Sequence, residues 1–91
     1  MLVLHTIKDC KTWRNKQTGS VGFVPTMGAL HEGHLSLIRQ SQKYCSKTII
    51  SIYINPSQFS ANEDLDSYPK TIENDFNHLK DLYVDAVFLP T

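Results

Sequence analysis

Short apolar runs alternate along the chain with longer segments in which apolar residues recur at helical spacing. Strands are predicted at the four apolar runs of strand length, at residues 2–5, 21–24, 48–54 and 84–89. Helices are predicted where the apolar spacing becomes three or four residues, at 7–17, 33–44 and 68–82. Because strands and helices alternate, the pattern predicts an α/β fold with a parallel sheet and right-handed helical crossovers.

The same spacing predicts which side chains of each helix face the sheet. In chain order they are Ile7, Cys10 and Trp13, then Leu35, Leu37, Ile38 and Ser41, then Ile72, Phe76, Leu79 and Leu82. Thr6 is the expected N-cap of the first helix, and Pro69 suits the first turn of the third. The run at 21–24 is apolar at almost every position, which is typical of a strand covered on both faces.

The turn after the second predicted strand is the strongest candidate for chemistry. Residues 25–30 contain Gly28, which permits a positive φ, and lead into His-Glu-Gly-His at 31–34, where a helix begins. Unpaired backbone N–H groups and the positive end of the helix dipole predict a phosphate site there. His31 and His34 lie on one face of the first turn and could both donate to a phosphate. The alternative is structural, with His31 capping the turn and His34 on the helix surface.

A second candidate pair follows the next predicted strand. Asn55 and Gln58 are neutral hydrogen-bonding residues at its carboxyl end, where parallel sheets bind ligands. The alternatives are turn formation by Asn55 and simple exposure of Gln58. The acidic residues of the following loop are expected to face solvent rather than to bind Mg²⁺; they are Glu63, Asp64 and Asp66.

Composition and charge narrow the classes of function. The chain has 91 residues, with Lys+Arg 9 and Asp+Glu 9, so we expect one domain, and the balanced charge argues against nucleic acid or an anionic membrane as partner. The apolar runs are too short to span a membrane, and the first residues lack the features of a signal peptide. Cys10 and Cys45 lack paired or metal-ligand spacing, so we expect free thiols, no metal site and a cytoplasmic location.

Three ordered blocks of sequence carry a more specific signal. They are Pro-Thr-Met-Gly-Ala-Leu-His-Glu-Gly-His at 25–34, Ser-Ile-Tyr-Ile-Asn-Pro-Ser-Gln-Phe at 51–59, and Asn-Glu-Asp-Leu-Asp-Ser-Tyr-Pro-Lys-Thr at 62–71 with the downstream Asp75. Together they resemble the pantothenate synthetase (pantoate–β-alanine ligase) family. The resemblance covers essentially the whole chain but only the start of the family's protein.

This resemblance implies a truncated Rossmann-like parallel sheet of the HxGH nucleotidyltransferase superfamily. Residues 1–91 would be the N-terminal part of the nucleotide-binding domain, with the C-terminal domain absent. The implied reaction joins pantoate to β-alanine: ATP and pantoate give pantoyl adenylate and pyrophosphate, and β-alanine then displaces AMP to give pantothenate. ATP and Mg²⁺ are the implied cofactors, and a full-length family member is expected to be a homodimer.

The resemblance also implies roles for individual residues. His34 resembles the family's proton donor and His31 its phosphate-contacting companion, which makes these two the catalytic candidates. The implied ATP-binding residues are Met27, Gly28, Ala29, Leu30, His31, Glu32, Gly33 and His34. The implied contacts for pantoate and β-alanine are Gln58, Asn55, Thr26 and Met27.

The family's later basic residues, second nucleotide-binding loop and C-terminal lid have no counterpart in these 91 residues. We therefore expect an open sheet edge, an uncovered apolar face, and little or no ligase activity from the chain alone. Two other interpretations stay open. One is a related nucleotidyltransferase that uses another acid, and the other is a non-catalytic binding or dimerisation module.

Overall fold

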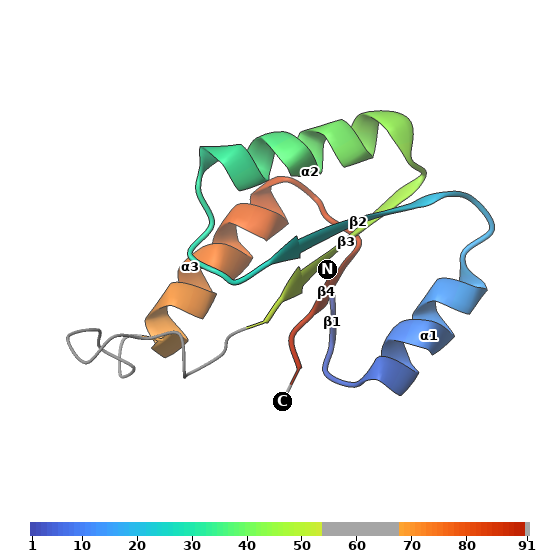
Figure 1. Ribbon diagram of the computed structural model, residues 1–91, viewed down its shortest axis with the longest axis horizontal. Coiled ribbons are helices and arrows are strands. Elements are labelled where there is room, and N and C mark those ends of the chain that lie inside the picture. Colours follow the sequence, from blue (N-terminus) through green and yellow to red (C-terminus); the bar gives the residue numbers. More distant parts are fainter. Residues whose placement is uncertain (54–67, 91) are drawn as a thin grey trace.

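The predicted alternation of strands and helices is confirmed. The computed structural model describes residues 1–53 and 68–90. Its strands are β1 (Leu2–Leu4), β2 (Val21–Thr26), β3 (Lys47–Ile52) and β4 (Ala86–Phe88). Its helices are α1 (Ile7–Lys16), α2 (Glu32–Tyr44) and α3 (Tyr68–Asp81) (Figure 1).

The strands form one parallel sheet in the order β1-β4-β3-β2. The order differs from the chain order because the connection through α1 leads from β1 at one edge of the sheet to β2 at the other, and β1 pairs with β4. The carbonyls of Ser20 and Thr26 accept the N–H groups of Lys47 (3.0 Å) and Tyr53 (3.0 Å), so β2 and β3 are joined along their full length. The turn after β2 therefore begins at a well-anchored point.

All four strands differ from the prediction at one end or both. β2 continues two residues further than expected, through Pro25 to Thr26. Proline is tolerated there because one side of an edge strand lacks a ladder partner for its backbone N–H. β4 covers only Ala86–Phe88, because the N–H of Val84 donates back to the carbonyl of Leu79 in the last turn of α3 (3.3 Å).

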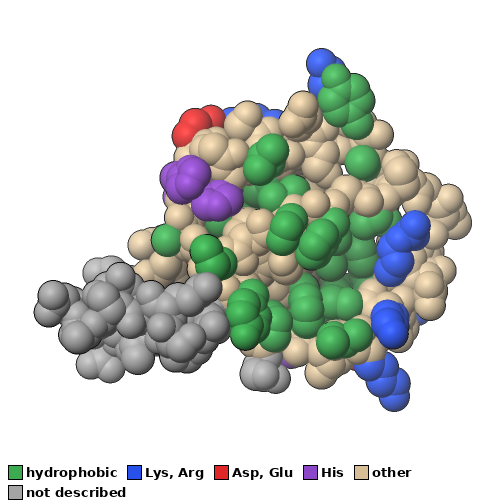
Figure 2. Space-filling view, in the orientation of Figure 1, with side chains coloured by type: hydrophobic (Ala, Val, Ile, Leu, Met, Phe, Trp, Pro, Cys, Tyr) green, Lys and Arg blue, Asp and Glu red, His purple; other side chains and the backbone are tan. Residues whose placement is uncertain are grey.

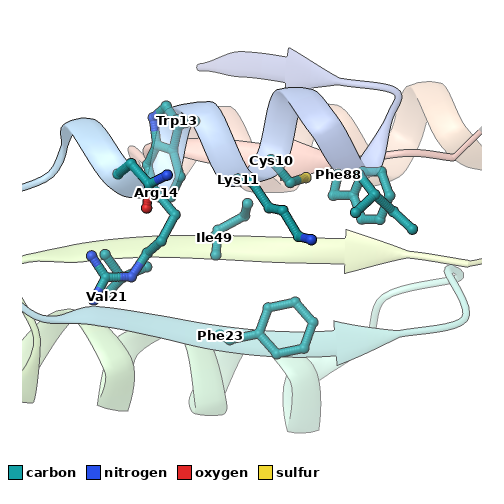
Figure 3. A pocket seen from close by; sticks show the side chains of 10 residues that line it. Cys10, Lys11, Trp13, Arg14, Val21, Phe23, Ile49 and Phe88 are labelled. Carbon is teal, nitrogen blue, oxygen red and sulfur yellow. The ribbon is translucent and has the colours of Figure 1, made fainter.

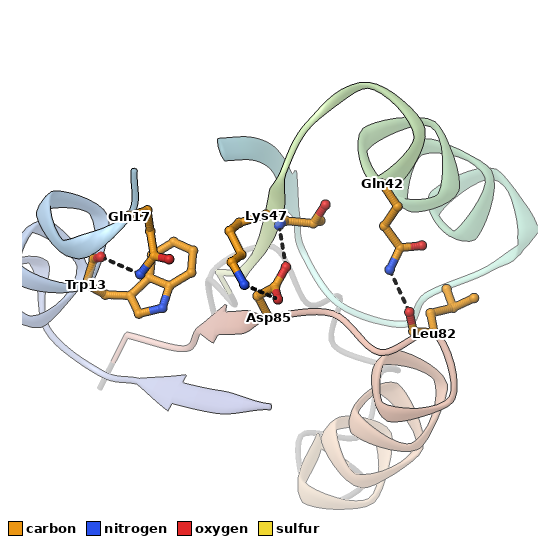
Figure 4. Close-up of polar contacts among 7 residues, drawn as sticks. Trp13, Gln17, Gln42, Lys47, Leu82 and Asp85 are labelled. Atoms are coloured by element: carbon orange, nitrogen blue, oxygen red, sulfur yellow. Dashed lines mark hydrogen bonds and ion pairs between the residues drawn. The ribbon is translucent and has the colours of Figure 1, made fainter. Parts of the chain in front are cut away.

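The larger core lies between the sheet and the helices α2 and α3. Its fully buried side chains include Ile38 of α2, Leu79 of α3 and Ile50 of β3. Polar contacts join the same elements: Gln42 of α2 donates to the carbonyl of Leu82 (2.6 Å) just after α3 (Figure 4). These contacts fix α3 beside α2, and the site depends on this placement.

The carboxylate of Asp85 holds the start of β3, at the amino ends of β2 and β3. It accepts the N–H of Thr48 at 2.8 Å. It also forms an ion pair with Lys47 at 3.8 Å (Figure 4). Asp85 therefore anchors the start of β3, far along the strands from the turn that follows β2.

Among the described residues, only α1 covers the other face of the sheet, and it covers that face in part. Cys10 and Trp13 pack there against a small core of Leu4, Ile49 and Ala86. Beside them an open hollow of about 500 Å³ extends over β2 and β3, with Lys11 and Arg14 reaching across it from α1 (Figure 3). The apolar side chains of this face are visible as the green area in Figure 2, so the predicted uncovered apolar face is confirmed.

Two side chains predicted to face the sheet are exposed instead. Ile7 is 66% exposed and lines the rim of the hollow, because the sheet face beyond α1 is open. Leu37 is 52% exposed and lines a second hollow of about 400 Å³ beside β2. Both corrections have the same cause: in the described residues β2 is an edge, so nothing covers the helix surfaces that extend beyond it.

Candidate functional site

The site is built on the turn that leaves the carboxyl end of β2. Gly28 (φ 85°) and Ala29 (φ 52°) take left-handed backbone conformations in succession. The buried hydroxyl of Thr26 donates to the carbonyl of Ser51 (2.9 Å) and accepts the N–H of Gly28 (3.2 Å). This hydroxyl therefore fixes the start of the turn to the neighbouring strand.

A carboxylate from α3 holds the rest of the turn. Asp75 is 2% exposed, and its two oxygens accept the N–H groups of Ala29 (2.9 Å) and Leu30 (2.8 Å). Sequence reasoning recorded Asp75 only as part of the resemblance and missed this role. Because the partners are 45 and 46 positions apart, no local spacing indicates the contact.

His31 and His34 lie directly after this turn and cap α2. His31 is the N-cap, and its Nδ1 accepts the N–H of Gly33 at 3.0 Å. The Nδ1 of His34 accepts the N–H of His31 at 3.2 Å, and the two ring centroids are 4.1 Å apart. Since each Nδ1 is an acceptor, each neutral ring carries its proton on Nε2. The structural and the functional interpretations are therefore compatible, because capping uses one ring nitrogen and leaves an Nε2–H donor.

The surroundings of His34 favour the neutral ring. Burial lowers the pKa of His34, the neighbouring His31 lowers it further, and the Asp75 carboxylate opposes these two effects. A neutral imidazole with its proton on Nε2 donates one hydrogen bond without bringing a charge of its own. The site can thus meet an anion with hydrogen-bond donors.

Several of the backbone N–H groups that the sequence offered for a phosphate already have partners in the structure. Five of these groups already have partners inside the segment or on α3; they belong to Gly28, Ala29, Leu30, His31 and Gly33. An anion at this helix end would therefore meet the imidazoles. Figure 2 shows histidine side chains gathered on the surface at one end of the molecule, next to acidic ones.

The other predicted site residues have different placements. Met27 is 62% exposed, whereas Thr26 is buried. Glu32 forms an ion pair with Arg39 at 2.6 Å on the surface of α2. Asn55 and Gln58 lie outside the described residues, as do the acidic residues at 63, 64 and 66.

Within residues 1–53 and 68–90, no group of three or more His, Cys, Asp or Glu side chains is placed to hold a metal ion. Cys10 and Cys45 are free thiols, and burial together with Asp9 raises the pKa of Cys10. None of the described helices is long and apolar enough to cross a membrane.

Comparison with known proteins identifies the family. The model of the pantoate-beta-alanine ligase family matches residues 2–91. The pantothenate synthetase of Rhodopirellula baltica is 53% identical over 94 residues, which cover 100% of this chain and 33% of the relative. The pantoate–β-alanine ligase of Saccharomyces cerevisiae is 46% identical over 96 residues, which cover 99% of this chain and 31% of the relative.

A solved structure agrees with the sequence comparisons. It is a pantoate-beta-alanine ligase from Francisella tularensis complexed with beta-gamma ATP and beta-alanine, and it matches with a TM-score of 0.78 and 37% identity over 99% of this chain and 35% of that one. The chain thus spans about a third of the length of the relatives it matches. The family model matches almost the whole chain, and the His-Glu-Gly-His helix start lies at the end of a strand in a parallel sheet. The chain therefore belongs to the pantoate–β-alanine ligase family.

Proposed function

We propose that this chain supplies the N-terminal part of the nucleotide-binding domain, with the adenylation histidines, of a pantoate–β-alanine ligase. The observation that carries the proposal is the paired histidine cap of α2. Backbone N–H groups donate to both Nδ1 atoms, so His31 and His34 keep their Nε2–H donors for a ligand. The Francisella tularensis structure contains beta-gamma ATP, which supports ATP as the nucleotide.

The proposed reaction has two balanced steps. A carboxylate oxygen of pantoate attacks the α-phosphorus of ATP, and the bond to pyrophosphate breaks. The amine of β-alanine then attacks the acyl carbon of pantoyl adenylate, the bond from that carbon to AMP breaks, AMP leaves with the electron pair of that bond, and the nitrogen releases a proton to solvent. Both steps build negative charge on phosphate oxygens. Fixed N–H donors stabilise such charge most when they are oriented before the reaction begins, and the histidine cap provides this orientation.

The remaining roles follow the family resemblance. Thr26, Met27, Asn55 and Gln58 are proposed to contact pantoate and β-alanine. Mg²⁺ is proposed to arrive bound to ATP, because proteins commonly hold Mg²⁺ through the phosphates of a substrate. We further propose a cytoplasmic location, and a homodimer for the complete ligase.

The proposal can be tested on the 91-residue chain by amide NMR. Titration with MgATP and then with pantoate should shift the resonances of residues 26–34. The His34→Ala variant should lose most of these shifts, whereas His78→Ala, which changes an exposed histidine on α3, should retain them. Shifts that survive in His34→Ala, or a folded spectrum that does not respond to MgATP, would contradict the assignment.

A second experiment separates the proposed function from its two alternatives. The chain is mixed with the remaining two thirds of a family ligase, and ATP–pyrophosphate exchange dependent on pantoate is measured. We expect little exchange from the chain alone and measurable exchange from the mixture. In the mixture His31→Ala or His34→Ala should lower the rate by orders of magnitude, and a loss below about tenfold, roughly 1.4 kcal/mol, would refute a catalytic role. Exchange supported equally by another acid indicates a different nucleotidyltransferase, and no exchange at all indicates a binding module.

A further inference from the structure

We propose that Asp75 is a positioning residue that holds the turn between β2 and α2 in the conformation that presents His31 and His34. The proposal rests on the function proposed above for the two histidines. It concerns a side chain on α3 that neither the charge pattern nor the local sequence marks out.

The two oxygens of the Asp75 carboxylate bind different backbone groups of the turn. Each oxygen of Asp75 accepts a different N–H, that of Ala29 at 2.9 Å and that of Leu30 at 2.8 Å. Hydrogen bonds from N–H groups to a carboxylate are stronger than those between neutral groups, and two together fix orientation as well as distance. The carboxylate therefore acts as a clamp on two successive peptide groups.

The burial of Asp75 supports the same role. Asp75 is 2% exposed, and neither ion pair among the described residues involves it. A charge removed from water is tolerated when hydrogen bonds replace its hydration. The turn supplies these bonds, so the fold of the turn and the burial of Asp75 depend on each other.

The backbone conformation of the turn needs stabilising contacts. Ala29 has a φ of 52° and Gly28 a φ of 85°. Left-handed backbone is unfavourable for a residue with a Cβ, and it persists only where the surrounding structure enforces it. The Asp75 carboxylate accepts hydrogen bonds from the N–H groups of Ala29 and of the next residue, Leu30, and so stabilises the unfavourable conformation.

The clamped turn leads directly into the catalytic candidates. Leu30 precedes His31, whose N–H donates to the Nδ1 of His34 and whose own Nδ1 caps α2. A displacement of Leu30 would therefore move the N–H that orients the His34 ring. Asp75 also influences His34 through its charge, which opposes the effects of burial and of His31 on the pKa of His34.

The matched test compares Asp75→Asn with Asp85→Asn in the 91-residue chain. Both carboxylates accept backbone N–H groups, but Asp85 binds Thr48 at the opposite end of β3. In Asp75→Asn the amides of Ala29 and Leu30 should exchange with solvent at least tenfold faster, while that of Ile50 changes less than twofold. The titration midpoint of His34 should also fall, because a negative charge is lost. In Asp85→Asn the turn amides and the His34 midpoint should stay unchanged.

A measurement on the unmodified chain keeps the proposal testable even if Asp75→Asn fails to fold. Through-hydrogen-bond NMR correlations should join the amide nitrogens of Ala29 and Leu30 to the carboxyl carbon of Asp75. Absence of both correlations, or unchanged exchange and an unchanged His34 midpoint in a folded Asp75→Asn, would overturn the proposal. No nucleotide is used, so a failure to bind MgATP refutes the proposed function and leaves this inference standing.

Discussion

A histidine that caps a helix has one ring nitrogen committed to the backbone, and this commitment decides what the other nitrogen can do. In this chain both members of the His31–His34 pair are committed in this way. Protonation of His34 at Nδ1 would remove the acceptor for the N–H of His31. The cap is thus sensitive to pH, and the direction of this sensitivity can be worked out.

We expect the chain to lose stability as the pH falls from 7.5 to 5.5. The folded-state pKa of His34 is lowered from its usual 6.5, so the unfolded chain binds a proton first and acid favours unfolding. The loss begins near pH 6.5 and levels off once folded His34 is protonated. Urea unfolding at several pH values measures it. The His34→Gln variant should show a shallower dependence on pH, and an equally steep one would contradict the explanation.

The buried hydroxyl of Thr26 offers a second test at the scale of a residue. Thr26→Val keeps the shape but leaves the carbonyl of Ser51 and the N–H of Gly28 without their partner. The free energy of unfolding should fall by about 2 kcal/mol. Thr26→Ser retains the hydroxyl and is the matched control. A loss in Thr26→Val no larger than the loss in Thr26→Ser would contradict the assignment of this stability to the hydroxyl.

Among the secondary-structure elements, α2 packs closely against β2 at Gly22. A Cβ added to Gly22 would overlap the side chain of Ser41 on α2 and lie 3.2 Å from the sulfur of Cys45. Ser41 cannot move freely, because its hydroxyl is 2.7 Å from that of Thr48 on β3. Gly22 therefore sets the distance between the helix and the sheet.

The Gly22→Ala variant should lower the free energy of unfolding by about 1 to 3 kcal/mol, the usual cost of overpacking. Ser41→Gly removes the obstructing side chain, at a cost of its own. The double variant should be more stable than the sum of the two single losses indicates, as measured by urea unfolding in a double-mutant cycle. Strict additivity would mean that the two residues do not compete for space.

Local pattern predicted the elements well and their surroundings less well. The spacing of apolar residues predicted every described helix and strand, because this spacing reflects the local backbone conformation. Ile7 and Leu37 fit the same periodicity and are exposed, because burial also requires an opposing surface. The histidine cap was visible as spacing, whereas the Asp75 clamp was not, because it joins residues 45 and 46 positions apart.

On the scale of the whole molecule, the open sheet face is a large exposed apolar surface of the described residues. Phe23 stands between the two hollows, lines both of them, and is 59% exposed. Apolar surface of this kind, next to an edge strand, favours association with another chain. The described part of the molecule therefore combines a well-formed site with a surface suited to a protein contact.

We expect the 91-residue chain to self-associate, with a larger associated fraction at higher concentration. Phe23→Lys should weaken this association by placing a charge on the open face. Tyr83→Lys, at an aromatic that is 86% exposed and outside both hollows, is the matched control and should leave it unchanged. Sedimentation velocity over a range of concentrations measures both. A concentration-independent monomer in the unmodified chain would contradict the expectation.

The position of β1 has a consequence for the order of events on the ribosome. The backbone of β1 is bonded to Asp85 and Leu89 on either side of β4, and β4 is its pairing strand. Residues 2–4 are synthesised early but have no partner until residues 86–88 leave the exit tunnel, several seconds later at typical rates of about 5 to 20 residues per second. During that interval, once α3 has also emerged, the turn and its histidines can already assemble between β2, α2, β3 and α3. The first strand made is thus among the last to join, and nascent chains paused before residue 86 should leave it open to proteases.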